Sequence, residues 1–308
     1  MEIYYSNKDF DINECVATVG FFDGVHIGHR FLINELKTIA ANQNKKSVVF
    51  TFAEHPRKVL HADFQPALIT TLDEKLTQLH STGVDACVVL DFSSAMSRLT
   101  ASEFLKDILF NQYNVRTLLV GHDHRFGHNR ADGFDDYRRY GAEMGLEVIQ
   151  ATRYTTPVFN HISSSEVRHA LQSGDVLKVA QLLSYNYSFV GTVVDGFKVG
   201  RKIGFPTANL KPLDDEKLIP GTGVYAVEVK WNDVAFKGMM NIGLRPTLEN
   251  GTKVSLEVNI FDFNEDIYHQ QLQVIFIQKI RDEQKFNGVD ALIEQLNRDK
   301  QKVLEIFD

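Results

Sequence analysis

Two histidines stand three residues apart in the stretch GFFDGVHIGH, which spans residues 20–29. The stretch connects a strand-like run, CVATVG, to a helix-like run, HRFLINELK. In a parallel α/β sheet, ligands bind at such connections. Glycines let the backbone approach a ligand closely, and the helix N-terminus offers unpaired N–H groups and a partial positive charge. With the imidazole donors of His26 and His29 added, the pattern predicts a binding site for phosphate oxygens.

Two other interpretations of these histidines stay open. Paired histidines near the start of a helix are often solvated capping residues, and an arbitrary HxxH pattern has this outcome in about two cases out of three. A zinc site is the weaker alternative, since no third ligand lies at a recognisable spacing.

A run of serines could serve the same anion. In ISSSEVR, three serines precede a helical pattern, and Arg168 returns one turn later. The serines are Ser163, Ser164 and Ser165. Taken alone, this motif is explained better as an ordinary serine N-cap. Its occurrence together with the histidine loop favours a phosphate site instead.

Two further motifs directly follow strand-like runs. TFAEHP (51–56) comes after SVVF, and GHDHRFG (121–127) comes after TLLV. Because the carboxyl ends of parallel strands meet at one edge of a sheet, both motifs should emerge on the same edge as the histidine loop. We therefore expect the three loops to wall one cleft.

The second half of the chain carries a different phosphate pattern. In GRKIGFPTANL, Gly200 and Gly204 permit a loop that closes over phosphates, and Pro206 favours an extended backbone at the residue before it. Thr207 and Asn209 then lie on one side of an extended segment, where a hydroxyl and an amide oxygen suit Mg²⁺ bound with ATP. No GxxxxGK[ST] sequence occurs in the chain, so kinase chemistry here would not use a P-loop.

Glu257 is the candidate base for such chemistry. In KVSLEVNIFDF, apolar residues alternate with Ser255, Glu257 and Asn259, so Glu257 stands on the polar face of a predicted strand. A carboxylate there could accept the proton of a hydroxyl that attacks a γ-phosphate. Considered alone, a solvated strand carboxylate is the more common outcome.

The two halves of the chain differ in organisation. Up to about residue 186, short apolar runs alternate with helical patterns, which indicates βαβ units around a parallel sheet. Beyond it, strand-like segments follow one another, and Trp231-Asn232-Asp233-Val234 is typical of a hairpin turn. The last segment, GVDALIEQLNRDKQKVLEIF, predicts a helix that covers an antiparallel sheet closed into a small barrel. We therefore predict two domains, 1–186 and 187–308.

Composition limits the function classes. Of 308 residues, 44% are hydrophobic, which is enough for packed cores, and 33 basic against 40 acidic residues give a net charge of −7. The absence of a basic block argues against a nucleic-acid partner. Neither a leader pattern nor an apolar run of membrane-spanning length occurs, so a cytoplasmic protein with no membrane partner is expected. Cys15 and Cys87 have no CxxC partner and are expected to be buried thiols.

These motifs carry a family resemblance. His26-Ile27-Gly28-His29 resembles the HxGH signature of the nucleotidyltransferase superfamily. GFFDGVHIGH, TFAEHP, GHDHRFG and ISSSEVR, in this order, resemble the adenylyltransferase module of bacterial bifunctional riboflavin kinase/FAD synthetases. GRKIGFPTANL resembles the signature of their riboflavin kinase module, and further similarity continues through GVYA, MNIGLRPT, LEVNIFDF and IRDEQKF. An ordered series over essentially the whole chain is far more specific than any single motif.

The resemblance implies a fold and two reactions. It implies an α/β nucleotidyltransferase domain with a Rossmann-like parallel sheet, which transfers AMP from ATP to FMN and gives FAD and pyrophosphate. It also implies an antiparallel β-barrel riboflavin kinase domain with a C-terminal helix, which phosphorylates riboflavin to FMN. The implied ligands are ATP, Mg²⁺, riboflavin, FMN and FAD, and a weak homo-oligomer is compatible with this family.

In the first module, the resemblance implies that His26 and His29 are catalytic. The residues implied to bind ATP and phosphate are Gly20, Phe21, Phe22, Asp23, Gly24, His26, His29, Ser163, Ser164, Ser165 and Arg168. The residues implied to contact the flavin or its phosphate are His55, Pro56, Asp123 and Phe126. For Phe126, simple core packing is an equally open alternative.

In the second module, the resemblance implies that Glu257 is catalytic and that Thr207 and Asn209 hold the metal. The residues implied to bind ATP are Gly200, Lys202, Gly204, Pro206, Thr207 and Asn209. The residues implied to lie near the flavin ring are Arg281, Glu283 and Phe286. Family members often carry histidine where this chain has Asn259, so the resemblance assigns no role to this residue.

Two competing functions remain at this stage. The first module could use another acceptor, such as pantetheine phosphate or a choline-type phosphate, but such an enzyme has no use for a riboflavin kinase module. The barrel could be a non-catalytic flavin- or RNA-binding module. The joint presence of Thr207, Asn209 and Glu257 favours catalysis.

Overall fold

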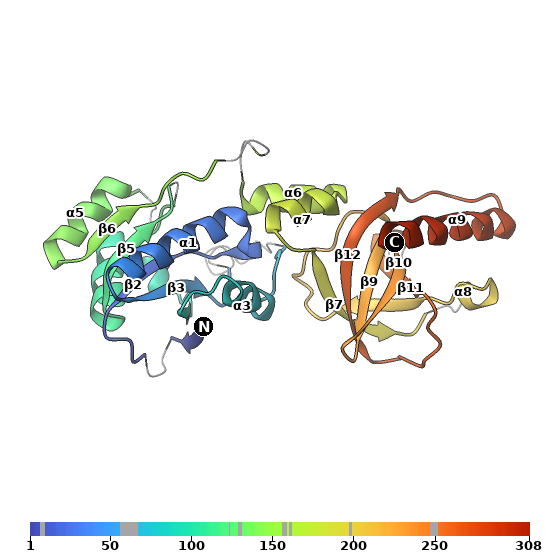
Figure 1. Cartoon of the computed structure of the whole chain (residues 1–308), viewed down its shortest axis with the longest axis horizontal. Coiled ribbons are helices and arrows are strands. Elements are labelled where there is room, and N and C mark those ends of the chain that lie inside the picture. Colours follow the sequence, from blue (N-terminus) through green and yellow to red (C-terminus); the bar gives the residue numbers. More distant parts are fainter. Residues whose placement is uncertain are drawn as a thin grey trace. The chain divides into compact units, whose positions relative to one another are not determined.

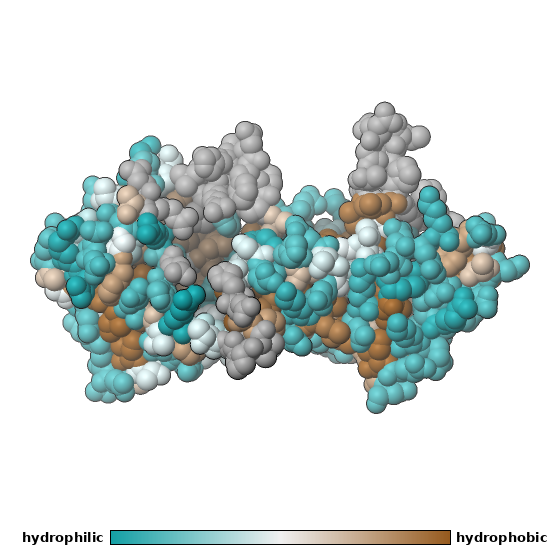
Figure 2. Space-filling view, turned by 90° about the horizontal axis from the view of Figure 1, so that it is seen from above, coloured by the Kyte–Doolittle hydropathy of each residue, from teal (hydrophilic) through white to brown (hydrophobic). Residues whose placement is uncertain are grey.

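The structure, a computed structural model, describes the chain except for residues 7–9, 56–66, 123, 129–130, 156–158, 160–161, 197–198 and 247–251, and except for the side chains of 199, 245, 246, 252 and 253. The described residues divide into two compact units, Met1–Ser164 and Ser165–Asp308. Figure 1 shows a helix-covered sheet in the first unit and a barrel in the second. The visible face of each unit is mostly hydrophilic, with hydrophobic areas of limited extent (Figure 2).

The first unit is built on a six-stranded parallel sheet with strand order β1-β4-β3-β2-β5-β6. Its strands are β1 (Glu2–Tyr5), β2 (Cys15–Val19), β3 (Lys46–Phe52), β4 (Ala86–Leu90), β5 (Val115–Val120) and β6 (Glu147–Gln150). Every residue of β2 and β4 is buried. This is the pattern of strands covered on both faces, and it explains their continuous apolar sequences.

Helices cover both faces of this sheet (Figure 1). The helical segments are η1 (Asp23–Val25), α1 (Ile27–Asn42), α3 (Leu72–His80), η2 (Met96–Arg98), α4 (Ala101–Glu103), the π-helix η3 (Phe104–Gln112) and α5 (Phe134–Met144). One core joins α1 and α3 to the sheet, and the other core joins α4, η3 and α5 to its opposite face. The unit is therefore the doubly wound α/β domain that the alternating pattern predicts.

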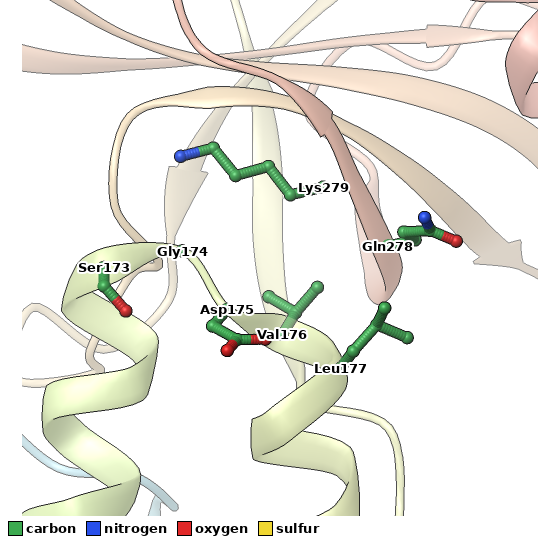
Figure 3. A pocket seen from close by; sticks show the side chains of 7 residues that line it. All are labelled: Ser173, Gly174, Asp175, Val176, Leu177, Gln278 and Lys279. Atoms are coloured by element: carbon green, nitrogen blue, oxygen red, sulfur yellow. The ribbon is translucent and has the colours of Figure 1, made fainter.

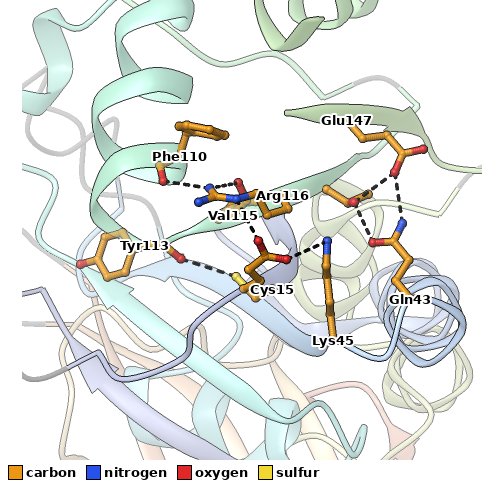
Figure 4. Close-up of polar contacts among 10 residues, drawn as sticks. Cys15, Gln43, Lys45, Phe110, Tyr113, Val115, Arg116 and Glu147 are labelled. Atoms are coloured by element: carbon orange, nitrogen blue, oxygen red, sulfur yellow. Dashed lines mark hydrogen bonds and ion pairs between the residues drawn. The ribbon is translucent and has the colours of Figure 1, made fainter. Parts of the chain in front are cut away.

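Polar side chains close the amino-terminal edge of the sheet (Figure 4). The Glu14 carboxylate lies 3.3 Å from Lys45 Nζ and 3.4 Å from Arg116 Nε. The Thr117 hydroxyl donates to the Glu147 carboxylate at 3.1 Å. This edge is filled by internal contacts, which leaves the carboxyl edge for ligands.

The second unit contains a closed barrel with strand order β10-β11-β8-β7-β12-β9. Its strands are β7 (Ser188–Val194), β8 (Ala208–Pro212), β9 (Gly223–Trp231), β10 (Val234–Pro246), β11 (Thr252–Ile260) and β12 (Gln271–Arg281). All of their pairings are antiparallel. Closure pairs every strand and leaves no bare edge. The predicted antiparallel barrel is confirmed.

The described residues of this part of the chain also form the helices α6 (Ser164–Ser173), α7 (Val176–Leu183), α8 (Val199–Lys202) and α9 (Val289–Phe307). The C-terminal helix α9 packs against the barrel through Val303, as predicted (Figure 1). The α6–α7 pair joins the barrel through a hydrogen bond from Gly221 N–H to the Leu171 carbonyl. The compact unit thus includes both helices, whereas the domain boundary after residue 186 stays a prediction.

Local predictions are mostly confirmed. The turn at Asn232 and Asp233 has positive φ at both residues, as a tight hairpin between twisted strands requires. Both cysteines are free and buried, and burial raises the pKa of the Cys15 and Cys87 thiols to about 12. The edge strand β1 was not predicted, because its residues are mostly exposed and show no apolar run.

Candidate active sites

The histidine loop lies at the topological switch point of the parallel sheet. Strand β2 has β3 on one side and β5 on the other, so the strand order reverses there. In open α/β sheets, ligands bind in the crevice outside the carboxyl ends of the strands at such a point. The loop after β2 is GFFDGVHIGH, and the loop after β5 is GHDHRFG. The structure therefore brings two predicted motifs to this crevice.

The backbone of the histidine loop adopts conformations that side chains disfavour. Phe22 has φ 55° and ψ 31°, Gly24 has φ 77°, and the β-branched Val25 has φ 39°. A bulky residue at positive φ is strained, and such strain persists only where the surroundings impose it. Phe22 and Val25 are buried at 3% and 0% exposure, so packing imposes this shape. The buried side chains of Phe22 and Val25 therefore hold the loop in this strained shape.

His26 caps helix α1. Its Nδ1 accepts a hydrogen bond from the backbone N–H of His29 at 3.3 Å. Because Nδ1 accepts, the ring proton is on Nε2, which is the ring nitrogen that would donate to a phosphate oxygen of a bound ligand. The capping interpretation is correct in part, but His26 is only 5% exposed and is not a solvated residue.

His29 stacks on His26, with ring centroids 3.6 Å apart and planes 15° from parallel. Burial, then His26, His124 and Lys75 nearby, lower the pKa of His29 well below its usual value of 6.5. The ring is therefore neutral at pH 7 and acts as a hydrogen-bond donor rather than a cation. In the described part of the chain, its buried Nδ1 has no hydrogen-bond partner. Such a group points to a ligand or an ordered water.

Buried polar groups also hold the histidine loop in place. Asp23 is 2% exposed, and its carboxylate accepts from the N–H groups of Ile69 and Thr70 at 3.2 and 3.0 Å. The Thr70 hydroxyl accepts from Gly24 N–H at 3.0 Å. On the predicted serine motif, Ser164 Oγ donates to the Asp23 carbonyl at 3.0 Å. Asp23 therefore shapes the loop through residues 69–70, a contact that the sequence motifs did not indicate.

The other predicted residues of the first site have different surroundings. His55 lies edge-on to the Phe21 ring, with centroids 4.5 Å apart. Phe126 stacks on Tyr137 at 4.2 Å and packs against the core, so one of its faces is already covered. Pro56 and Asp123 lie outside the described residues. Ser163 lies in the first unit, whereas Ser165 and Arg168 lie on α6 in the second.

In the barrel, the predicted base and the two predicted metal ligands lie together where β8 pairs with β11. Glu257 on β11 lies directly opposite Asn209 on β8, so their side chains are on the same face. The Thr207 hydroxyl faces the Glu257 carboxylate at 3.4 Å. A hydroxyl, an amide and a carboxylate are all oxygen donors, the kind that Mg²⁺ prefers, so this set fits the implied metal. No cluster of three or more His, Cys, Asp or Glu that could hold a metal occurs in the described part.

Two glycines allow the nucleotide segment to pack this closely. A Cβ added at Gly196 would lie 2.0 Å from Asn209 Nδ2, and one added at Gly200 would lie 2.2 Å from the Phe205 carbonyl oxygen. Of the remaining predicted residues, Lys202 and Pro206 are exposed, and Gly204 has φ 81°. The sequence motif did not include Gly196.

Asn259 holds the segment around Pro206 and Thr207 through a side-chain hydrogen bond. Its side chain is 6% exposed, and its Nδ2 donates to the Pro206 carbonyl at 2.6 Å. Pro206 directly precedes Thr207, so this bond fixes the peptide group that carries the predicted metal ligand. Asn259 lies on the same face of β11 as Glu257, two residues further on, but its side chain is buried. The alternating pattern gave no sign of a partner 53 positions away.

The predicted flavin contacts of the barrel lie at the end of β12 and in the segment that follows it. The Arg281 guanidinium donates to both oxygens of the Asp299 carboxylate, at 2.7 to 3.1 Å, and thereby ties β12 to α9. The Phe286 ring centroid lies 5.8 Å from the Arg281 guanidinium carbon. Glu283 lies against Gly243, where an added Cβ would come within 2.4 Å of Glu283 Oε1. Arg281 is therefore engaged in the protein itself, and the flavin contacts of all three residues stay predictions.

A separate pocket of about 260 Å³ contains none of these residues. It lies between the α6–α7 turn and β12, where the Lys279 side chain extends over the turn (Figure 3). The Lys279 ammonium forms an ion pair with Asp282 at 2.7 Å. Its lining is Ser173, Gly174, Asp175, Val176, Leu177, Gln278 and Lys279. This pocket is not one of the candidate active sites.

A histidine loop at a switch point and an oxygen-ligand cluster on a barrel define a transferase with two nucleotide sites. Residues 9–166 match the FAD synthetase family and residues 183–307 match the riboflavin kinase family. A bifunctional riboflavin kinase/FMN adenylyltransferase from Listeria monocytogenes is 37% identical over 96% of this chain and 93% of its own length. One from Escherichia coli strain K12 is 38% identical over 95% and 93%. The chain belongs to the family of bifunctional riboflavin kinase/FMN adenylyltransferases.

One solved structure has the same fold as this chain over nearly its whole length. A macrolide-efflux protein from Streptococcus pneumoniae has a TM-score of 0.87 and 33% sequence identity, and the match covers 98% of both chains. In the described part of the present chain, helices are all too short or too polar to cross a membrane.

Proposed function

We propose that this chain converts riboflavin to FMN in its barrel unit and FMN to FAD in its α/β unit, with one ATP used at each step. The observation that carries the proposal is the assembly of Asn209 and Glu257 on one barrel ladder with the Thr207 hydroxyl beside them, in the same chain as a buried HxGH loop at a switch point. A binding module would have no need for a base beside oxygen ligands for a metal. The domains proposed for the two reactions are 1–186 and 187–308.

Adenylylation needs no covalent enzyme intermediate. A phosphate oxygen of FMN attacks the α-phosphorus of ATP in line, the bond to the β-phosphate bridging oxygen breaks, and pyrophosphate leaves. Catalysis then consists of positioning and charge stabilisation. His26, with its proton on Nε2, and the neutral His29 donate hydrogen bonds as negative charge moves toward the leaving group. The N–H groups of residues 20–24 line the adenosine and α-phosphate side.

Ser163, Ser164, Ser165 and Arg168 contact the phosphates in this proposal. The Ser164 side chain already contacts the histidine loop, which supports its place at the site. His55, Pro56, Asp123 and Phe126 contact the FMN, with Phe126 offering the ring face that Tyr137 does not cover.

Phosphorylation of riboflavin uses Glu257 as the base. Its carboxylate accepts the proton of the ribityl 5′-hydroxyl as the hydroxyl oxygen attacks the γ-phosphorus and ADP leaves. Thr207 and Asn209 would hold Mg²⁺, which neutralises charge on the transferring phosphoryl group. Gly200, Lys202, Gly204 and Pro206 form the loop around the ATP phosphates. Arg281, Glu283 and Phe286 lie beside the flavin ring.

The partners in this proposal are small molecules, with no nucleic acid and no membrane. We place the protein in the cytoplasm, because both reactions consume ATP and both cysteines are free thiols. A weak homo-oligomer stays a prediction.

The test is a pair of assays on each purified variant, one started with riboflavin and one with FMN. Loss of a general base costs about 10² to 10⁴ in rate, so Glu257→Gln should lose this much riboflavin phosphorylation and keep adenylylation of supplied FMN. His29→Ala should have the reverse effect. Glu265→Gln, at an exposed carboxylate of the barrel unit, is the matched control and should keep both activities. A loss of phosphorylation below about tenfold in Glu257→Gln would leave Glu257 a structural carboxylate.

A further inference from the structure

Lys75 is a buried lysine beneath the candidate adenylyltransferase site. It lies on α3 and is 2% exposed. Its Nζ donates to the Phe21 carbonyl at 3.2 Å and to the Phe52 carbonyl at 2.8 Å. It also lies 4.1 Å from the centroid of the Phe21 ring. The three N–H groups of the ammonium can thus be used by two carbonyls and one ring face.

These contacts join two separate loops of the site. Phe21 belongs to the histidine loop, which follows β2. Phe52 ends β3 and begins the loop that carries His55, and the His55 ring packs against Phe21. A single cation therefore sets the distance between the loop proposed to hold the ATP phosphates and the loop proposed to contact FMN. Lysine is rarely buried without such a use, because an ammonium loses much hydration energy.

We propose that protonated Lys75 is a positioning residue of the adenylyltransferase site, holding the histidine loop and the His55 loop at the separation that in-line transfer requires. The proposal rests on the adenylyltransferase activity proposed above. Lys75 does not contact substrate in this account. It acts through the backbone of Phe21 and Phe52, where a displacement of about 1 Å is enough to cost about 10²-fold in rate.

Lys75 loses its positive charge at a lower pH than an exposed lysine does. Burial lowers the pKa of Lys75 to about 8, although Asp23 and Cys87 nearby favour the charged form. The other titratable group that faces it in the described part is His29, on α1. The pKa of Cys87 is about 12 and that of His29 is well below 6.5, so neither titrates just above pH 8. A neutral amine donates weaker hydrogen bonds and loses its attraction to the Phe21 ring. The contacts of Lys75 with both loops should therefore weaken as pH rises through about 8.

The experiment measures FMN adenylylation by the full-length chain from about pH 7 to about pH 9.5, where the substrate phosphates, with pKa near 6, are already ionised. Riboflavin phosphorylation by the same sample is the internal control. In the wild type, kcat/KM for adenylylation should fall about tenfold per pH unit beyond the pKa, while phosphorylation shows no matching fall. A wild type that adenylylates FMN with a flat profile overturns the proposal for Lys75 alone. A wild type that forms no FAD at any pH overturns the proposed function as well.

Two substitutions test whether the fall belongs to Lys75. Lys75→Arg keeps a cation with a pKa above about 12, so the fall should move more than one pH unit upward. Lys75→Met keeps the length and removes the charge, so adenylylation should drop about 10- to 100-fold at neutral pH and lose its alkaline fall. An unshifted fall in either variant, or adenylylation within about twofold of wild type in Lys75→Met, overturns the proposal.

Lys37→Met is the matched control. Lys37 also donates to a backbone carbonyl, that of Thr82, at 2.7 Å, but this contact lies away from both loops. We expect Lys37→Met to keep the wild-type pH profile. A Lys75 variant that fails to fold would lose both the control phosphorylation and a cooperative thermal transition. In that case the wild-type pH profile still tests the proposal, because an alkaline fall in adenylylation supports it and a flat profile overturns it.

Discussion

Replacing Asn259 by alanine isolates the support that a buried amide gives to the kinase nucleotide segment. The substitution removes the 2.6 Å hydrogen bond to the Pro206 carbonyl. Such a bond between neutral groups contributes about 0.5–1.5 kcal/mol. Because the side chain is only 6% exposed, truncation also leaves a void, which costs about 1 kcal/mol more. The expected loss of stability is therefore about 1.5–2.5 kcal/mol.

The free energy of the hydrogen bond alone sets the expected effect on rate. The bond holds the peptide group before Thr207, so its full strength is available for positioning the proposed metal ligand. At about 1.36 kcal/mol per tenfold, the loss of about 0.5–1.5 kcal/mol corresponds to about 2- to 13-fold slower riboflavin phosphorylation. Asn259→His retains an N–H donor at this position and should recover part of the rate. Adenylylation of FMN, carried out in the other unit, should not change.

Asn297→Ala is the matched control for this prediction. Asn297 is exposed on α9, and its Nδ2 also donates to a backbone carbonyl, that of Ile293, at 2.9 Å. It should leave both activities at the wild-type level. Phosphorylation within about twofold of wild type in Asn259→Ala, or an equal loss in the control, would refute the reasoning. So would a parallel loss of adenylylation, since that would indicate general unfolding.

Three further predictions follow from the barrel unit. Fragment 165–308, which retains α6 and α7, should unfold cooperatively at a higher temperature than fragment 188–308, and equal melting temperatures would contradict a supporting role for these helices. Arg281→Met leaves the buried Asp299 carboxylate with the Gln295 amide but without its cationic partner, and should cost about 3–5 kcal/mol in urea unfolding. A cost below about 1 kcal/mol would mean that solvent replaces the pair. Gly243→Ala places a methyl group against the Glu283 carboxylate, in the segment after β12, so the KM for riboflavin should rise. The KM for FMN in adenylylation should stay constant. An unchanged KM for riboflavin would mean that this segment does not contact the flavin.

Much of the fold was predictable because its signals are local. Strands β2, β3 and β5 are largely buried runs rich in apolar residues, and each leads into a motif at the carboxyl edge of the sheet. The hairpin at residues 231–234 was predictable for the same reason, since Asn and Asp tolerate the positive φ that the turn needs. Strand β1 was missed because an exposed edge strand of four residues carries no periodic apolar signal.

The residues missed at the candidate sites are those whose partners are distant in sequence. Lys75 stands in LDEKLTQLH at the position between Leu72 and Leu79 that the apolar stripe of the helix would occupy, next to Leu76. That placement was the available signal, since a lysine within an apolar stripe is either buried with partners or unfavourable. The identity of its partners, at the ends of two strands, depends on the order of strands in the sheet, which local pattern does not specify.

Both units support their nucleotide loops in the same physical way. In the α/β unit, Lys75 donates to backbone carbonyls at the start of two loops, and Asp23, within the histidine loop, accepts from the backbone N–H groups of residues 69–70. In the barrel, Asn259 donates to the Pro206 carbonyl. Each of these side chains is at most 6% exposed, so water cannot replace its hydrogen bonds when the loop moves. A loop fixed in this way loses little conformational freedom when ATP binds. The entropic cost of positioning the reacting groups is therefore lower. Substitutions at these buried residues should therefore lower the rate of one reaction while the other, in the same chain, continues.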